Sequence, residues 1–383
     1  MQLTRSEDDA LSGKHGESLA SAYRILVAIG EATHAERLVP IKWAHVSGVN
    51  YNTIGDAGVR FLEHFTASAR VAVRTTINPM GYDRTRLEGI SEKFMEKQRS
   101  ITNSYEKMGV TPSFTCTPYE IFDIPERGSP VSFAESNAAV FSNSVLGLMT
   151  NKESALSALA SSVTAKAPLS DLRASEARNP RVAIKPDFAL ETELDYGLLG
   201  YFAGRVVKES CVALEGIDSP STMQGKALSA GMGTSGSCGM FTLGDANGER
   251  ISFGRKEARG LIDELSTADD GDLITLGSPQ LGMGELELLS RLLDGKKFTK
   301  PCMIFCSRAI HDQAAKLGLT DSIQRSGAEF ICDSCTCLTP YVSKTQHDAV
   351  IANSVKAAYY LNNSNKVGVA LKDLHTIVGE YSQ

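Results

Sequence analysis

The chain has 383 residues, of which 42% are hydrophobic and 22% charged, and its formal net charge is -6. These values predict a globular protein of two or three domains with a sizeable core. The chain is acidic and has no block of Lys and Arg residues, which argues against nucleic acid and anionic membranes as partners. It also has no apolar run of about 18 residues, the length needed to span a bilayer. Its polar N-terminus resembles neither a secretory signal nor a transit peptide, so we expect a cytoplasmic protein.

The first part of the chain, residues 1–150, alternates helical patterns with β-branched runs that end in polar turns. Such alternation is typical of α/β lobes, in which strands and helices follow one another. We expect helices over 17–33 and 86–109, the second ended by Gly109, and strands over 38–49, 70–81 and 110–120.

The last part, residues 266–383, repeats a short apolar run followed by a Cys/Ser/Gly loop. We expect strands over 272–282, 301–310 and 328–340, separated by helices over 284–295 and 311–318. This order predicts βαβ units and a parallel sheet, with a ligand crevice lined by the loops after the strands. Residues 151–265, richer in Ala, Ser and Gly, form a predicted middle lobe.

Residues 231–236, GMGTSG, match the glycine pattern of a dinucleotide-binding loop. That loop binds a pyrophosphate where a strand leads through the glycines into a helix. Here a helical segment precedes the glycines and an apolar run follows them. The inverted order argues against a nicotinamide or flavin cofactor.

Three of the eight cysteines lie within residues 332–337. A reducing cytosol disfavours disulfides, and a single C-x-x-C lacks the second pair that structural zinc sites use. Pro340 and the preceding strand fit a thioredoxin-like redox motif poorly. An iron–sulfur site takes single cysteines from several loops, and Cys116, Cys306 and Cys335 each lie at a predicted strand end. From the residues alone, an iron–sulfur site and small buried thiols both stay open.

Polar residues also gather in three segments that follow predicted strands: 44–58, 134–144 and 306–308. Capped turns, a helix N-cap at Ser136 and a surface Arg308 would explain them structurally. A dense polar set after a strand more often binds a ligand, and an arginine in a crevice can clamp a carboxylate or phosphate.

These segments together resemble one known family, aconitase X, over nearly the full length of the chain. The matching stretches are AHVSGVNYNTIGDAG, TINPMGYD, TCTPYE, ESNAAVFSNSVLG, DYGLLGYFAGR, ALSAGMGTSGS, DLITLGSPQ, CSRAI, CDSCTCLTP and NSVKAAYY. Many motifs in one order make the resemblance specific.

The resemblance implies an α/β fold, with an aconitase-like large part of several α/β lobes and mostly parallel sheets around a central crevice. It implies an iron–sulfur cluster that acts as a Lewis acid in dehydrating a small hydroxy acid. We expect a 4Fe–4S cluster, with 3Fe–4S or 2Fe–2S as alternatives. The chain ends just past NSVKAAYY, so the small swivelling domain of fused members is expected as a separate subunit.

Separate subunits favour 5-phosphomevalonate as the substrate, in a modified mevalonate pathway of isoprenoid biosynthesis. The enzymatic alternative is the large part of a cis-3-hydroxy-L-proline dehydratase. An alternative of another class is a cluster-bearing regulatory or binding protein that has lost catalysis.

The chain departs from the family at one ligand loop, where Ser278 replaces the usual cysteine. Cys116 and Cys335 match the other two loops. A neutral hydroxyl is a poor iron ligand beside thiolates, so we expect a neighbouring cysteine as the third ligand. Cys306 is the first choice and Cys337 the second.

The resemblance also suggests the residues of the active site. The expected catalytic group is His45, Ser47, Asn137 and Arg308. The expected substrate-binding group is Gly48, Arg74, Asn78, Glu135, Ser136, Ser307, Asn353, Ser354 and Lys356. The general base is expected on the small subunit.

Overall fold

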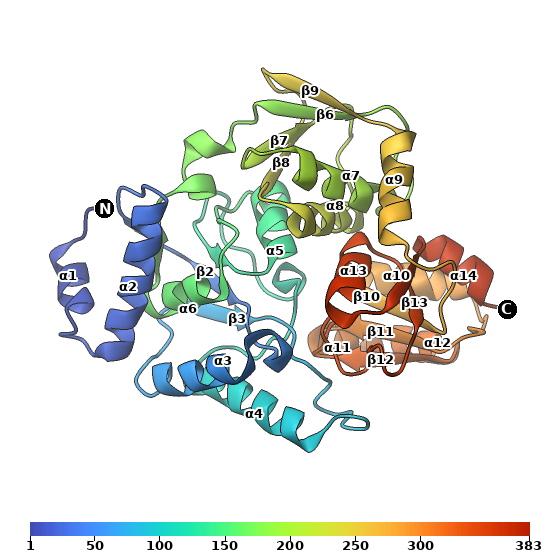
Figure 1. Cartoon of the computed structure of the whole chain (residues 1–383), viewed down its shortest axis with the longest axis horizontal. Helices are drawn as coiled ribbons and strands as arrows, with labels where there is room; N and C mark the ends of the chain where they lie inside the picture. The colour runs from blue at the N-terminus through green and yellow to red at the C-terminus, as the bar shows by residue number, and fades with distance from the viewer.

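The computed structural model describes residues 1–383, and its strands form three parallel sheets, one in each third of the chain (Figure 1). The first, in the order β3-β2-β4, contains β2 (Trp43–Val46), β3 (Arg74–Ile77) and β4 (Ser132–Phe133). The second, β8-β7-β6-β9, contains β6 (Val182–Pro186), β7 (Cys211–Leu214), β8 (Met240–Leu243) and β9 (Glu249–Phe253). The third, β12-β11-β10-β13-β14, contains β10 (Leu273–Leu281), β11 (Cys302–Cys306), β12 (Ala328–Cys332), β13 (Ala349–Ala352) and β14 (Gly368–Leu371). The predicted α/β class with mostly parallel sheets is confirmed; the one antiparallel pair joins β1 (Leu38–Pro40) to β5 (Lys166–Pro168).

Helices surround each sheet. Around the first lie α1 (Arg5–Leu11), α2 (Glu17–Ala32), α3 (Tyr51–Phe65), α4 (Glu92–Lys107), α5 (Ser136–Phe141) and α6 (Ala155–Thr164). The second has α7 (Glu193–Val206), α8 (Thr222–Ser235) and α9 (Arg255–Leu265). The third has α10 (Met283–Leu293), α11 (Arg308–Lys316), α12 (Leu319–Gln324), α13 (Val355–Tyr360) and α14 (Leu374–Tyr381). None of these helices is long and apolar enough to span a bilayer.

The strands that carry the site are apolar because both faces of their sheets are covered. Every residue of β2 and of β10 is buried, as expected for central strands of parallel sheets. Apart from a few buried polar side chains, such as His45 on β2 and Gln280 on β10, most polar side chains of this region lie in the loops that follow the strands. Those loops supply the candidate site described below.

The three lobes share one apolar interior. Its members include Leu38 from the first lobe, Leu199 from the second and Val355 from the third. Helix α8 packs on α7 and α5 and also contacts α13, so these helices join the lobes near the centre of the molecule (Figure 1).

Three predicted elements differ from the structure. The single strand expected over 38–49 is two strands, β1 and β2, which belong to different sheets. Segment 110–120 is not a strand: the Ser113 hydroxyl accepts from the Ile77 N–H, and Phe114 has a positive φ of 41°. These two features leave only an isolated bridge to β3. The helix expected over 86–109 begins later, where the Ser91 side chain caps the N-terminus of α4.

The glycine pattern at 231–236 lies at the end of α8 and is followed by β8. This order confirms the predicted helix-then-strand arrangement, which is the reverse of a dinucleotide-binding loop.

Candidate active site

A cavity of about 530 Å³ opens where the carboxyl ends of the first and third sheets face each other. Its walls are the loops that follow β2, β3, β4 and β12, the segment that contains Cys116, Ser278 of β10, and α13. Loops at the carboxyl ends of parallel strands are where α/β proteins bind ligands. Of the predicted residues, this cavity brings together Ser47, Gly48, Asn78, Cys116, Glu135, Ser136, Cys335 and Lys356.

Three cysteines from two loops line this cavity: Cys116, Cys335 and Cys337. The Cys116 sulfur accepts a hydrogen bond of 3.1 Å from the Gln280 backbone N–H. The Cys337 sulfur lies 3.2 Å from the Ser278 hydroxyl oxygen. A hydrogen bond with Cys337 lowers the pKa of Cys335 to about 7, so this thiol readily becomes a thiolate.

Cys306, the predicted third ligand, lies elsewhere. It is the last residue of β11, pairs in register with Cys332, and is fully buried in the apolar core of the third lobe beside Ile310 and Ala314. Its side chain therefore faces the helices that cover the sheet and not the cavity. Of the two candidates for the third ligand, the second choice, Cys337, lines the cavity, and the first choice, Cys306, does not.

A buried ammonium stands beside the cysteines. Lys356 pairs with Glu135 and donates a hydrogen bond of 2.8 Å to the Asn137 side chain. Burial by itself would lower the pKa of Lys356, but the Glu135 carboxylate raises it above its ordinary value. The lysine is therefore charged. A lysine has three N–H donors, so one remains for a ligand in the cavity.

Two amide side chains hold this ion pair in place. Asn78 donates to the second Glu135 oxygen at 2.6 Å, and Asn137 donates to the Cys116 backbone carbonyl at 3.1 Å. Asn137 is fully buried and does not line the cavity. Predicted as catalytic, it instead connects Lys356 to the cysteine loop.

His45, also predicted as catalytic, is fully buried behind the cavity wall. Its Nδ1 atom lies 2.8 Å from the Thr76 hydroxyl, and burial lowers the pKa of the imidazole to about 4. A neutral, enclosed ring cannot exchange a proton directly with a ligand in the cavity.

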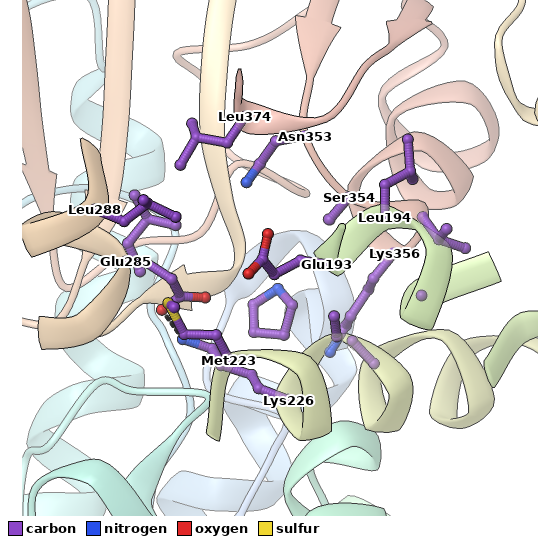
Figure 2. A pocket seen from close by; sticks show the side chains of 16 residues that line it. Glu193, Leu194, Met223, Lys226, Glu285, Leu288, Asn353, Ser354, Lys356 and Leu374 are labelled. Carbon is purple, nitrogen blue, oxygen red and sulfur yellow. Dashed lines mark hydrogen bonds and ion pairs between the residues drawn. The ribbon is translucent and has the colours of Figure 1, made fainter. Parts of the chain in front are cut away.

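A smaller pocket is lined by residues of α7, α8, β10, α10 and α13 (Figure 2). Its volume is about 50 Å³, enough for water but not for an organic substrate. The predicted residues Asn353 and Ser354 line this pocket, and the Ser354 hydroxyl donates to the Ser278 carbonyl. Lys356 borders both spaces.

Three further predicted residues lie outside the cavity. Arg74 begins β3, at the opposite end of the strand from the crevice, where it donates to the Asp123 carbonyl and covers the Trp43 ring. Arg308 pairs with Asp83 at 2.5 Å and with Asp333 at 3.0 Å, so its guanidinium already has two carboxylate partners. Ser307 is a buried N-cap of α11.

The comparisons with known proteins cover the whole chain. Sequence models described as the first, second and third domains of aconitase X match residues 1–176, 180–272 and 271–382. A phosphomevalonate dehydratase large subunit from Methanocaldococcus jannaschii is 34% identical and covers 99% of this chain and 99% of the relative. Another, from Methanothermobacter thermautotrophicus, is 37% identical, with coverages of 94% and 93%. The crystal structure of Thermococcus kodakaraensis aconitase X (holo-form) matches with a TM-score of 0.92 at 33% identity and full coverage of both chains.

The chain belongs to the aconitase X family. It is a hydro-lyase of this family and is similar to its phosphomevalonate dehydratase large subunits. A second group of aconitase X relatives has a different substrate. The cis-3-hydroxy-L-proline dehydratase of Pseudomonas aeruginosa is 33% identical, and the match covers 94% of this chain and 66% of the relative.

Aconitase X proteins generally use an iron–sulfur cluster, and the donor set in this chain fits one. Cys116, Cys335 and Cys337 offer three thiols around one cavity, with the Ser278 hydroxyl beside them. Thiolates are the ligands that such clusters take. No three His, Cys, Asp or Glu side chains lie close enough to hold a single metal ion.

The sequence argument missed two residues that support this aconitase X site. Gln280 is fully buried; its side chain accepts from the Cys116 N–H at 3.3 Å and donates to the Ser334 carbonyl at 2.8 Å. Lys226, also buried, donates to the Gln280 carbonyl at 2.6 Å and pairs with Glu285 (Figure 2). Gln280 could have been found from the sequence, because it lies two residues after Ser278 in one of the family motifs. No sequence feature pointed to Lys226.

Proposed function

We propose that this chain is the large, catalytic subunit of a phosphomevalonate dehydratase that acts with a separate small subunit. The reaction removes water from 5-phosphomevalonate: a C–O bond and a neighbouring C–H bond break, and a C=C bond forms in an anhydromevalonate phosphate. Large subunits with this name are 33–37% identical to the chain over at least 92% of their own length. These relatives support the proposal.

One observation carries the choice of substrate. Glu135 is the single acidic side chain that lines the cavity, and its two oxygens already accept from Asn78 and Lys356. A hydroxyproline needs an acidic partner for its ammonium group, and none is free here. A substrate that carries a carboxylate and a phosphate needs donors and cations, which Lys356 and the surrounding hydroxyl and amide groups supply.

Each cavity residue has a role in this proposal. The Lys356 ammonium binds an anionic group of the substrate, while Glu135 and Asn137 fix its position. Cys116, Cys335 and Cys337 would hold the iron–sulfur cluster, with Ser278 beside them. When bound there, the cluster supplies Lewis-acid chemistry for the departure of the hydroxyl group.

The proton acceptor is proposed to lie outside this chain. Lys356 is protonated, both Glu135 oxygens are occupied, and His45 is enclosed behind the wall. No ionisable group of the cavity, apart from the thiols assigned to the cluster, is then a free base. A small subunit that closes the crevice would supply the base and exclude water.

The test is dehydration by the anaerobically purified complex with a co-expressed small subunit. We expect 5-phosphomevalonate to lose one water, followed by phosphorus NMR and mass spectrometry, and cis-3-hydroxy-L-proline to stay unchanged. Turnover of hydroxyproline in place of phosphomevalonate would establish the alternative substrate. No turnover of either by a complex that retains iron would favour a non-catalytic, cluster-bearing protein.

A further inference from the structure

Three fully buried side chains form a hydrogen-bonded chain behind the cavity. Trp43 and His45 lie two residues apart on β2, and Thr76 is the register partner of His45 on β3. The Trp43 indole N–H donates to the Thr76 hydroxyl oxygen at 2.9 Å, and the same oxygen lies 2.8 Å from His45 Nδ1. No other side chain shares this hydroxyl.

The direction of each hydrogen bond follows from the donor inventory. An indole N–H can only donate, so the Thr76 oxygen accepts from Trp43. The Thr76 hydroxyl proton has no other acceptor, so we assign it to the bond with His45, whose Nδ1 then accepts it. A neutral imidazole that accepts at Nδ1 carries its proton at Nε2.

The His45 imidazole lies near the Asn78 side chain and the Thr115 backbone, and His45 Nε2 and Asn78 Oδ1 are both buried polar atoms without a hydrogen-bond partner. A proton at Nε2 would give the Asn78 oxygen the donor that it lacks. The Asn78 amide nitrogen then points the other way, to Glu135 at 2.6 Å.

We propose that His45 is a positioning residue, locked by Trp43 and Thr76 as the neutral Nε2–H tautomer, which orients Asn78 so that Glu135 holds Lys356 for substrate binding. The consequence for binding rests on the proposed function, whereas the tautomer does not. Without the Nε2 proton, Asn78 could turn its oxygen toward Glu135. Two acceptors would then face each other, and the ion pair would lose its second anchor.

The first test is the tautomer in the unmodified full-length chain, labelled with nitrogen-15 at histidine. We expect one histidine ring with its proton on Nε2 and no titration between about pH 5.5 and 8. Contact of its ring protons with Phe133, whose ring centroid lies 5.7 Å away, identifies it as His45. A proton on Nδ1, or a charged ring in this range, would overturn the proposal.

The second test compares two variants of the same residue. In His45→Gln an amide N–H reaches the former Nε2 position, whereas in His45→Asn the amide ends near Nδ1. We expect His45→Gln to retain most activity of the complex and His45→Asn to raise the KM for 5-phosphomevalonate about tenfold with kcat changed less. Equal losses in both variants, at equal iron content, would contradict the positioning role.

The two hypotheses fail in distinguishable ways. An Nε2–H tautomer in a complex that does not dehydrate phosphomevalonate would refute the proposed function and leave the tautomer lock standing. The Nδ1–H tautomer in an active complex would do the reverse.

Discussion

At the scale of single residues, the three cysteines of the cavity differ from the other five by their surroundings. Cys116, Cys335 and Cys337 line a polar cavity, while Cys306 is enclosed by apolar side chains of the third lobe. Access and thiolate character decide which cysteines bind a cluster. The position of a sulfur along the chain is a weaker guide than the space it faces.

This difference predicts the outcome of cysteine replacement. We expect Cys337→Ala, like Cys116→Ala and Cys335→Ala, to lose most iron and sulfide from anaerobically purified protein, whereas Cys306→Ala keeps both. Ser278→Ala should keep most of the iron, because a neutral hydroxyl is a weak ligand. Iron loss in Cys306→Ala together with retention in Cys337→Ala, both folded by circular dichroism, would show that the ligand is Cys306.

Lys356 and Glu135 form a nearly buried ion pair, which predicts an asymmetric mutational response. Lys356→Met should abolish turnover and destabilise the fold by about 3–5 kcal/mol, because it leaves the carboxylate unpaired. The double variant with Glu135→Gln should recover most of that stability, measured by denaturant unfolding, but no activity. A double variant as unstable as Lys356→Met would mean that the lost contacts, and not the unpaired charge, cause the effect.

His45 predicts a pH dependence of stability. Its pKa is lowered from 6.5 to about 4 in the folded chain, so the unfolded chain takes up a proton at a higher pH than the folded one. Its contribution is therefore complete above about pH 6.5 and is lost as the pH falls from there to about 4. The full loss is about 3 kcal/mol.

Urea unfolding from pH 7 to 5 measures this effect, with His45→Gln as the matched control. The free energy of unfolding should fall less steeply in the variant than in the parent chain. Parallel pH profiles would show that other groups dominate the acid sensitivity.

At the scale of elements, β10 and the loops it touches explain why the first and third lobes meet correctly. Gln280 bonds through its side chain to both ends of the 114–116 segment and to the loop after β12. Lys226 on α8 holds the Gln280 carbonyl from the second lobe. One residue of a buried strand therefore connects the segments that carry Cys116 and Cys335.

We expect Gln280→Met to be costly although its volume is similar. The substitution leaves the Cys116 N–H and two buried carbonyls without partners, a destabilisation of about 3 kcal/mol or more. It should also slow the reassembly of a cluster in apo-protein, followed by absorbance. Gln324→Met, on the exposed surface of α12, is the control and should change neither quantity. Unchanged stability in Gln280→Met would refute the connecting role.

At the scale of the whole molecule, the crevice between the lobes holds binding groups but lacks a free base. The shared core fixes the lobes around this crevice, and we propose that a separate subunit closes it. This arrangement agrees with relatives that are named large subunits.

The prediction at this scale concerns the isolated chain. It should bind iron but dehydrate 5-phosphomevalonate at a negligible rate, and addition of the small subunit should restore turnover. A stoichiometric titration monitored by activity measures this. Full turnover by the isolated chain would require a base within it and would contradict the assignment.

The sequence by itself determined the α/β class, the family, and the placement of Cys116, Glu135, Cys335 and Lys356 around one crevice. These conclusions depend on local periodicity and on motifs whose residues follow strands. In a parallel sheet the residues that follow the strands meet at the same edge, so their proximity can be expected without knowing the full structure. The predicted strand over 110–120 is wrong, because the Ser113 side chain, and not a backbone carbonyl of this segment, accepts the hydrogen bond from the Ile77 N–H.

Only the tertiary structure shows which cysteines line the cavity and that His45 is enclosed behind its wall. Cys306 ends β11 within the apolar core of the third lobe, whereas Cys337 lies in the loop after β12 and lines the cavity. Arg74 and Arg308 were both expected in the active site. Arg74 lies at the end of β3 that is remote from the cavity, and the Arg308 guanidinium is already paired with two aspartates. The hydrogen bonds that join Trp43, Thr76 and His45, and those that join Asn78, Glu135 and Lys356, connect residues far apart in sequence. Strand register and lobe packing bring these residues together, and no local pattern encodes either.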